Sequence, residues 1–415
     1  MINTINIVHV NAEIKENSVP YRLQIALGKS GIQTSILTTK TDVIDDDIYV
    51  TDCTLFGRIL RKIDYLLLKF EYHIFRFDNK ELPFSFYRTG MNISRNSMIK
   101  KADIIVLHWI CANYISPRNL KQLIRTKIPI VIVCHDSWYF TGGCHVRLGC
   151  ERFTEKCGKC PELNSDIMKD WSYKMLRMKK RALKGSQITV VSPSKWMDSN
   201  VSRSALLRDY KHYVIPNPID IQLFSMKDDE RIDPEGKIIL AFGAVNAVST
   251  SYKGYSKLME ALDILEKEYI GDIQVQALVF GAKEGEERLN KKIKIKYLGY
   301  LSENQMIKLF HNVDIYVMPS LDDNLPGTVM ESLACGTPVV AFETGGIPDM
   351  ICHKKNGYLA EYNNSEDLAK GIFWVMTNNK NNALGKFGRE HIVNCFSENV
   401  VANQYAELFD RLIND

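Results

Sequence analysis

Short apolar runs alternate with amphipathic stretches along the whole chain, and this alternation limits the possible fold more than any other feature. Runs rich in β-branched residues are typical of buried strands, and the stretches between them have helical spacing. Because 415 residues exceed what one hydrophobic core usually holds, we expect an α/β protein with two doubly wound, Rossmann-like domains. The expected strands are 5–10, 33–38, 104–109, 129–134, 187–192, 211–215, 237–242, 273–280, 295–297, 314–318 and 337–342.

Two prolines mark the boundary between the domains. Pro216 and Pro218 bar regular structure in the segment 214–220, which leaves a short stiff connector. We expect a first domain at 1–217 and a second at 218–392. In the remainder, 393–415, apolar residues recur at helical spacing and predict a C-terminal helix.

Composition excludes several classes of protein. The net charge of +4 and pI near 8.4 fall short of a dedicated nucleic-acid binder, so we expect no nucleic-acid partner. The N-terminus lacks the basic leader of a signal peptide, and no run approaches the roughly 18 to 20 apolar residues of a spanning helix. We therefore expect a cytoplasmic protein whose ten cysteines are thiols or metal ligands more readily than disulfides.

The segment 319–340 reads as a strand end, a polar loop, a short helix and a second strand. Pro326 fits the start of the helix, and Gly336 fits a left-handed residue at its end. The amides of Gly327 and Thr328 would lie at the positive end of the helix dipole, where a phosphate is held. Two carboxylates bracket this point, Asp323 and Glu331, and each could accept hydrogen bonds from sugar hydroxyls. The segment therefore predicts binding of a nucleotide sugar.

Asp323, the seven-residue gap, Glu331 and the following Ala-Cys-Gly-Thr-Pro-Val-Val resemble the signature of the retaining glycosyltransferases of family GT4. That family has the GT-B fold, in which two Rossmann-like domains face a central cleft and the last helix returns to the first domain. The resemblance implies an acceptor-binding first domain and a second domain that binds a nucleotide diphosphate sugar. It also implies transfer with retention and without a catalytic metal. The chain departs from the family pattern at Asp323, where Glu is usual.

The second domain should supply the donor contacts. Gly243 ends a strand and allows close backbone approach, and Lys253 before a glycine matches a family lysine that contacts the diphosphate. Family members usually carry an arginine near this lysine, and this chain does not. The resemblance implies catalytic roles for Lys253, Asp323 and Glu331. The implied donor-binding residues are Gly243, Lys253, Leu301, Asn324, Leu325, Gly327, Thr328 and Glu331.

His135 follows the expected strand 129–134, where an imidazole could donate a hydrogen bond to the sugar or to the acceptor hydroxyl. The run His-Asp-x-Trp-x-Phe-Thr-Gly-Gly-Cys that begins there resembles an element in a branch of GT4. It implies a catalytic role for His135 and an acceptor-side position for His135 and Asp136. A histidine that serves structure alone is the alternative.

Four cysteines follow in a glycine- and lysine-rich loop with the spacing C-x5-C-x6-C-x2-C: Cys144, Cys150, Cys157 and Cys160. We refer to them as the cysteine cluster. Four thiolates could hold a structural zinc ion, and the final C-x2-C pair has normal ligand spacing. Two disulfides or four independent thiols are the alternatives.

Two basic amphipathic stretches, 56–70 and 174–184, could lie on anionic lipid and bring the enzyme to a lipid-linked acceptor at the inner face of the cytoplasmic membrane. They could equally be solvated faces of domain helices. Enzymes of this GT4 branch commonly build capsular, exopolysaccharide or O-antigen repeat units. The resemblance therefore implies a glycan acceptor, with a polyprenyl-diphosphate-linked glycan as a plausible form.

A second hypothesis is a GT-B protein that binds a sugar nucleotide or a partner enzyme and turns over slowly or not at all. It draws on Asp323, on the missing arginine, and on 11–20, which stands where most relatives have a Gly-Gly loop. An NAD-type Rossmann enzyme lacks its G-x-G-x-x-G fingerprint here. A GT-A enzyme would need an acidic metal motif, and 45–47 reads as a surface loop. We reject these last two.

Overall fold

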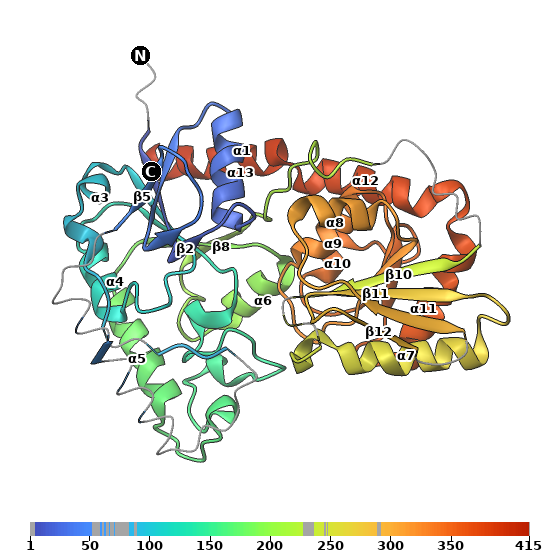
Figure 1. The fold of residues 1–415 in the computed structure, drawn as a ribbon. Helices are drawn as coiled ribbons and strands as arrows, with labels where there is room; N and C mark the ends of the chain where they lie inside the picture. Colours follow the sequence, from blue (N-terminus) through green and yellow to red (C-terminus); the bar gives the residue numbers. More distant parts are fainter. Residues whose placement is uncertain are drawn as a thin grey trace. The chain divides into compact units, whose positions relative to one another are not determined.

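The computed structural model describes residues 5–51, 59, 62–63, 66, 70, 83–86, 89–226, 236–244, 246, 248–288 and 292–414. Contacts between residues divide the chain into two units, Met1–Pro218 with Val401–Asp415, and Ile219–Val400. Each unit contains one seven-stranded sheet with helices packed against it (Figure 1). The predicted fold class of two Rossmann-like α/β domains is therefore confirmed.

The sheet of the first unit has the order β5-β3-β1-β6-β7-β8-β9, and all neighbouring strands run parallel. The central strands are buried along their whole length because helices cover both faces. The strands are β1 (Ile7–Val10), β3 (Thr34–Thr38), β5 (Ile48–Val50), β6 (Ile104–Leu107), β7 (Ile130–Val133), β8 (Ile188–Ser192) and β9 (Lys211–Val214). A separate parallel pair consists of β2 (Glu13–Ile14) and β4 (Lys40–Thr41).

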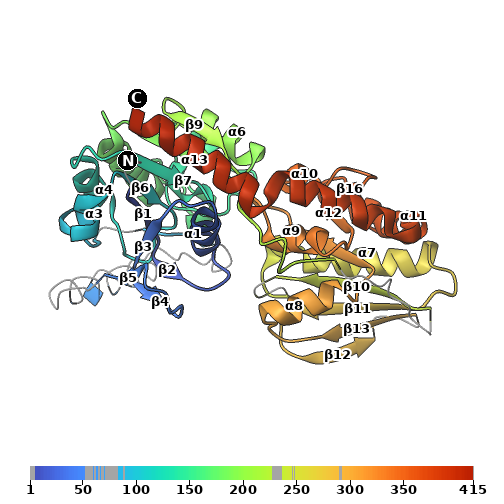
Figure 2. The same cartoon turned by 90° about the horizontal axis from the view of Figure 1, so that it is seen from above.

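Two apolar layers sandwich this sheet. One contains residues of α3, α4, α5 and α6, and the other contains residues of α1 and the C-terminal helix α13. The helices are α1 (Val19–Lys29), α3 (Ser97–Lys101), α4 (Pro117–Ile124), α5 (Trp171–Leu183), α6 (Lys195–Arg203) and α13 (Glu398–Asn414). Figure 2 shows α13 running along the first unit. Val401, Tyr405 and Phe409 of α13 are nearly inaccessible to solvent, so the predicted return of the last helix to the first domain is confirmed.

The sheet of the second unit has the order β12-β13-β11-β10-β14-β15-β16, parallel except for the edge pair β12 and β13. Its strands are β10 (Ile238–Gly243), β11 (Val275–Phe280), β12 (Gly285–Arg288), β13 (Ile293–Tyr297), β14 (Ile315–Met318), β15 (Val339–Phe342) and β16 (Gly357–Ala360). Its helices are α7 (Tyr255–Glu268), α8 (Glu303–Phe310), α9 (Gly327–Ala334), α10 (Ile347–Met350), α11 (Ser365–Asn378) and α12 (Ala383–Phe396). One face packs on α7 and α11, and the other on α8, α9, α10 and α12.

Short 3-10 helices occupy several connections: η1 (Ile93–Arg95), η2 (Ser137–Phe140), η3 (Arg152–Thr154), η4 (Pro161–Leu163), η5 (Ser251–Lys253) and η6 (Lys380–Asn382). The segment after β9 leads into the second unit, where the Ile219 amide donates to the carbonyl of Phe396.

Candidate functional site

The N-terminus of α9 is the first part of the candidate site. The helix begins at Gly327 with Pro326 at its N-cap, and no side chain caps its first turn. Gly336 follows the helix with φ +80°, as the sequence predicts. Uncapped amides at the positive end of a helix dipole are suited to an anion. The Glu331 carboxylate reaches back over this turn, since its Oε1 lies 3.6 Å from the position that a Cβ on Gly327 would take.

Tyr316 ties this helix start to the end of strand β10. Its side chain is fully buried, and its hydroxyl donates to the Gly243 carbonyl oxygen at 3.0 Å and lies 2.9 Å from the Thr328 hydroxyl. Burial raises the pKa of Tyr316, so the hydroxyl keeps its proton. The structure thus brings the predicted residues Gly243, Gly327, Thr328 and Glu331 to one place.

Lys253 and Asp323 form an ion pair, with Nζ 2.6 Å from Oδ2. Their side chains are only 19% and 17% exposed. Burial by itself lowers the pKa of Lys253, but the charge of Asp323 and its hydrogen bond outweigh burial and raise this pKa above its ordinary value. Lys253 therefore stays a cation. Two residues that are 70 positions apart in the sequence thus meet in the folded domain.

Two glycines hold the loop between β14 and α9 in place. Gly254 has φ +77°, and a Cβ there would lie 1.8 Å from the Pro319 carbonyl oxygen. Gly345 has φ +58°, and a Cβ there would lie 1.7 Å from the Asp323 carbonyl oxygen. Only glycine permits such approach in this backbone conformation. The Gly346 amide also donates to the Asp323 carbonyl, so the backbone at Asp323 is fixed.

A pocket of about 620 Å³ lies at the ends of β11 and β13, and its lining includes Gly281, Glu284, Tyr297 and Tyr300. The Tyr300 hydroxyl donates to Oδ1 of Asn246, which also lines the pocket, at 2.8 Å. Such a volume is typical of small-molecule sites. Leu301 follows Tyr300 directly, and its side chain packs in part against the core.

Asn324 and Leu325 lie in the loop before α9. Leu325 is 6% exposed and belongs to the apolar core, so only its backbone could contact a ligand. Asn324 is partly buried beside it.

In the first unit, His135 follows β7 and its Nε2 lies 2.9 Å from His108 Nδ1. The neighbouring Asp136 makes hydrogen bonds elsewhere, although its charge acts against burial on the pKa of His135. Its Oδ1 accepts from the Trp138 amide at 2.8 Å, and its Oδ2 accepts from His145 Nδ1 at 2.6 Å. Asp136 therefore caps η2 and holds His145.

Sequence reasoning missed two histidines that adjoin His135. His9 in β1 and His108 after β6 are fully buried, and His9 Nδ1 lies 2.9 Å from His108 Nε2. The signal in the sequence was a histidine within or just after each of three apolar strands.

The cysteine cluster lines one small pocket beside Thr141, Arg147 and Phe153, and all four of its thiols are free. Burial raises the pKa of Cys157 to about 11 and that of Cys160 to about 12. Within the described residues, no group of three or more His, Cys, Asp or Glu side chains is arranged to hold a metal ion. The four cysteines lie around one pocket, and zinc at the cluster stays a sequence prediction.

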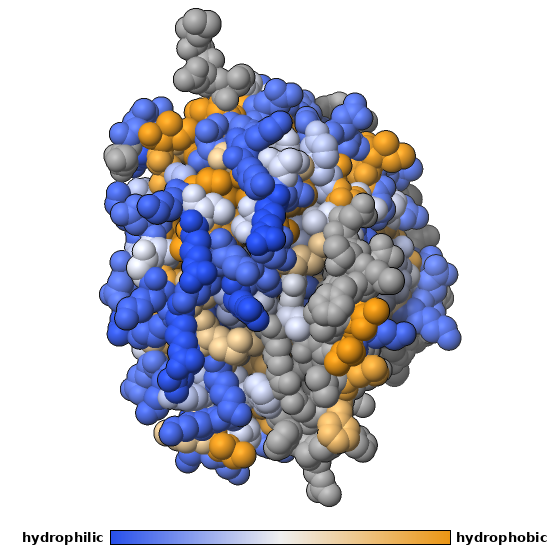
Figure 3. Space-filling view, turned by 90° about the vertical axis from the view of Figure 1, so that its left-hand side faces the viewer, coloured by the Kyte–Doolittle hydropathy of each residue, from blue (hydrophilic) through white to orange (hydrophobic). Residues whose placement is uncertain are grey.

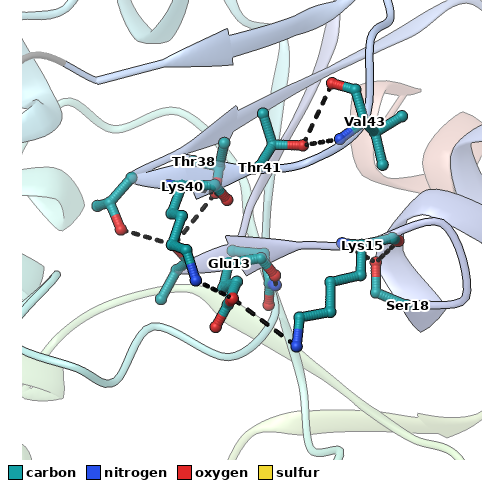
Figure 4. A network of polar contacts seen from close by, with 10 residues as sticks. Glu13, Lys15, Ser18, Thr38, Lys40, Thr41 and Val43 are labelled. Carbon is teal, nitrogen blue, oxygen red and sulfur yellow. Dashed lines mark hydrogen bonds and ion pairs between the residues drawn. The ribbon is translucent and has the colours of Figure 1, made fainter.

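The loop after β1 lies where GT4 glycosyltransferases usually have a Gly-Gly element. Its first amides donate hydrogen bonds to carbonyls within the first unit. The Asn11 amide donates to Leu37, and the Ala12 amide donates to Trp109. Figure 4 shows the pair β2 and β4 that follows, with Glu13 between two lysines: Lys40 at 2.7 Å and Lys15 at 3.8 Å. This loop offers side-chain charge in place of open amides.

The basic stretch 174–184 lies on α5, whose apolar side faces the core. Lys179 is 2% exposed and donates to the carbonyls of Trp138 and Thr141, so it is no part of a basic surface. Burial lowers its pKa to about 8. Figure 3 shows one face of the protein. Among its coloured atoms, hydrophilic residues predominate.

The other stretch, 56–70, lies mostly outside the described residues. Its described apolar residues are helical and 48% to 62% exposed: Ile59, Ile63, Leu66 and Phe70. Among the helices that the structure describes, we find none with the length and apolar character needed to cross a membrane.

Residues 225–391 match the family model described as glycosyl transferases group 1. An uncharacterised glycosyltransferase of Haemophilus influenzae is 31% identical over 150 residues, which are 35% of this chain and 40% of the relative. N,N'-diacetylbacillosaminyl-diphospho-undecaprenol alpha-1,3-N-acetylgalactosaminyltransferase of Campylobacter jejuni is 30% identical over 122 residues, 29% of this chain and 32% of that protein. The chain thus spans well under half the length of these relatives.

Solved structures match over nearly the whole chain. Sucrose-phosphate synthase from Thermosynechococcus elongatus has a TM-score of 0.64 at 16% identity and covers 99% of both chains. Anabaena Alr3699/HepE, solved in complex with UDP and glucose, has a TM-score of 0.60 at 15% identity and covers 98% of this chain and 100% of its own. At this identity the likeness shows the fold, which is the predicted GT-B fold.

Proposed function

We propose that this protein is a retaining glycosyltransferase that moves a sugar from a nucleotide diphosphate sugar to a glycan acceptor. The observation that carries the proposal is the meeting of Lys253 and Asp323 beside the uncapped start of α9, with Glu331 over the same turn. The match of 225–391 to the group 1 glycosyltransferases supports it, because all these residues lie in that segment. The second domain would bind the donor.

In this proposal the protein acts through position and charge. Lys253 and the amides of Gly327 and Thr328 stabilise the leaving diphosphate, Glu331 accepts from the ribose, and Asp323 accepts from sugar hydroxyls. The acceptor oxygen attacks on the face that the diphosphate leaves, and its proton passes to the donor phosphate. No metal ion takes part.

We further propose that the acceptor is lipid-linked and that the protein works at the cytoplasmic face of a membrane in surface polysaccharide synthesis. The Campylobacter jejuni relative carries diphospho-undecaprenol in its name, which supports an acceptor of this class. The exposed apolar residues Ile59, Ile63, Leu66 and Phe70 are spaced at helical intervals and could dip into lipid.

A donor screen tests this function. UDP-glucose, other UDP sugars, GDP-mannose and ADP-glucose are each supplied with a polyprenyl-diphosphate-linked glycan, and release of nucleoside diphosphate is measured with and without EDTA. We expect EDTA-insensitive turnover of one donor and, by NMR of the product, the same anomeric configuration as in that donor. An inverted product would refute retention.

Glu331→Ala should weaken binding of the matching nucleoside diphosphate by about tenfold, since a charge-assisted hydrogen bond is lost. Glu390→Ala, at an exposed position of α12, is the matched control and should leave affinity unchanged. Unchanged affinity in Glu331→Ala would remove the ribose assignment.

A catalytically weak GT-B binding protein is the second candidate. The occupied amides of the β1 loop favour it, because they leave fewer donors for a phosphate in the first domain. Tight binding of a nucleotide sugar without turnover of any donor in the screen would support this candidate.

A further inference from the structure

Three histidines form a continuous hydrogen-bonded chain inside the first domain. His9 Nδ1 lies 2.9 Å from His108 Nε2, and His108 Nδ1 lies 2.9 Å from His135 Nε2. Neighbouring rings are stacked with centroids 5.2 Å apart in both pairs. The Tyr139 hydroxyl donates to the His108 carbonyl and anchors the middle member.

Strand register explains why the three rings meet. His9 pairs with Val106 across β1 and β6, and His108 lies two residues beyond Val106. Val106 pairs with Val131 across β6 and β7, which places His135 two residues beyond the position level with His108. Steps of two residues keep side chains on one face of a sheet. The chain therefore runs diagonally, from the buried centre of the sheet to its carboxyl edge.

All three rings are neutral at physiological pH. Burial lowers the pKa of His9 to about 3 and the pKa of His135 to about 4, and it holds the pKa of His108 well below the usual value. Each ring then carries one proton, and each of the two hydrogen bonds uses one. Only two arrangements satisfy both bonds: all three protons on Nδ1, or all three on Nε2.

The inner end of the chain distinguishes these arrangements. His9 Nε2 is buried and has no hydrogen-bond partner among the described residues. A proton there would leave an N–H donor buried without an acceptor, which proteins avoid more strictly than a bare acceptor nitrogen. The arrangement with every proton on Nδ1 is therefore favoured.

We propose that His9 and His108 are positioning residues, which hold His135 as a neutral imidazole with its proton on Nδ1. In that form His135 Nε2 accepts from His108 and Nδ1 carries the proton, so the ring has no lone pair with which to act as a base. This inference rests on the proposed function only for what His135 faces during sugar transfer. The tautomer itself follows from the chain of rings.

NMR of protein labelled with ¹⁵N at histidine tests the tautomer directly. Long-range ¹H–¹⁵N spectra at pH 7 should show His9, His108 and His135 neutral, each with a protonated Nδ1 and a bare Nε2. A His135 signal from an Nε2–H tautomer or an imidazolium would overturn the proposal. This measurement needs no variant and no activity.

Variants then test the coupling. His108→Phe keeps an aromatic ring but cuts the chain, so His135 should lose its single tautomer and show a mixture. His9→Asn, which can still donate from the δ position, should keep His135 on Nδ1 better than His9→Phe does. His212→Gln, in β9 and paired with Asp198, is the control and should change nothing at His135. An unchanged His135 spectrum in His108→Phe would refute the coupling.

Kinetics separate this inference from the proposed function. If the wild type transfers sugar, His9→Phe should lower kcat on the order of tenfold while KM for the donor stays within about twofold. His9→Asn should recover part of the loss. If the wild type transfers nothing, the proposed function fails, and the spectra still decide whether the chain sets the tautomer.

Discussion

Replacing Asp323 by Asn should weaken the folded protein and strengthen its binding of a nucleoside diphosphate. Asp323 and Lys253 neutralise each other in the unliganded protein. A diphosphate brings its own negative charge to the same lysine, so it competes with Asp323. Asn has nearly the shape of Asp, and the change therefore removes charge with little effect on packing.

The geometry sets the expected size. At 2.6 Å between Nζ and Oδ2, an effective dielectric of about 20 gives a gross attraction of about 6 kcal/mol. Burial of two charges offsets most of this, and the remaining exposure of 17% to 19% screens part of the rest, so we expect a net effect of about 1–3 kcal/mol. Urea unfolding without ligand should show the free energy of unfolding reduced by this amount.

Titration calorimetry measures the affinity for UDP, or for the nucleoside diphosphate of the donor that the screen identifies. Asp323→Asn should bind the diphosphate about tenfold more tightly, which corresponds to about 1.4 kcal/mol. Lys253→Met should bind it about tenfold more weakly. Turnover should fall in both variants, because Asp323 is assigned to the sugar and Lys253 to the leaving group.

The two variants should change the affinity for the diphosphate in opposite directions. If Asp323→Asn weakens diphosphate binding as Lys253→Met does, Asp323 supports the nucleotide and does not compete with it. Raising the salt concentration should shrink the difference between the two variants, since it screens the charges involved.

Three further predictions concern stability and the cysteine cluster. Gly345→Ala should lower the free energy of unfolding by more than about 2 kcal/mol in a urea assay, because the new Cβ would lie 1.7 Å from the Asp323 carbonyl oxygen and φ is +58°. Gly28→Ala in α1 is the control. No atom lies within 4 Å of its Cβ position, so this change should be neutral or stabilising in the same assay. Burial sets the pKa of His9 near 3 and of His135 near 4, below the usual 6.5, so the unfolded chain binds more protons below about pH 6.5. The free energy of unfolding should therefore fall by about 1.4 kcal/mol per pH unit for each histidine as the pH drops from about 6.5 to 4. The His9→Phe variant should show a smaller slope than the wild type. Equal slopes in the two proteins would contradict this prediction. Elemental analysis tests the zinc prediction for the cysteine cluster, and about one zinc per chain would confirm it. Metal-free protein whose four thiols react fully only after unfolding would exclude it.

Most strands could be predicted from the sequence because their own residues are apolar. β6, β7 and β15 are buried on both faces and read as unbroken hydrophobic runs. Two of the strands that were missed, β12 and β5, lie at sheet edges and depend on a neighbour for their structure. β12 has the sequence Gly-Glu-Glu-Arg and is a strand because it pairs with β13, and β5 is partly exposed at the other sheet's edge.

The candidate site divides in the same way. Asp323, Gly327 and Glu331 lie within one local motif, so spacing alone could predict them. The pairing of Lys253 with Asp323 depends on two loops that meet only in the folded domain. The histidine chain depends on strand register, which no local pattern contains, and so only His135 was found from sequence.

The place of α13 also bears on how the protein is made. The last helix supplies Val401, Tyr405 and Phe409 to an apolar layer whose other members come from the first 218 residues. During synthesis, the part of this side of the sheet that α13 covers therefore stays exposed until the intervening domain has emerged from the ribosome. A fragment that stops at Pro218 should consequently aggregate when expressed alone, whereas Ile219–Val400 is contiguous and has a better prospect of folding as an independent piece.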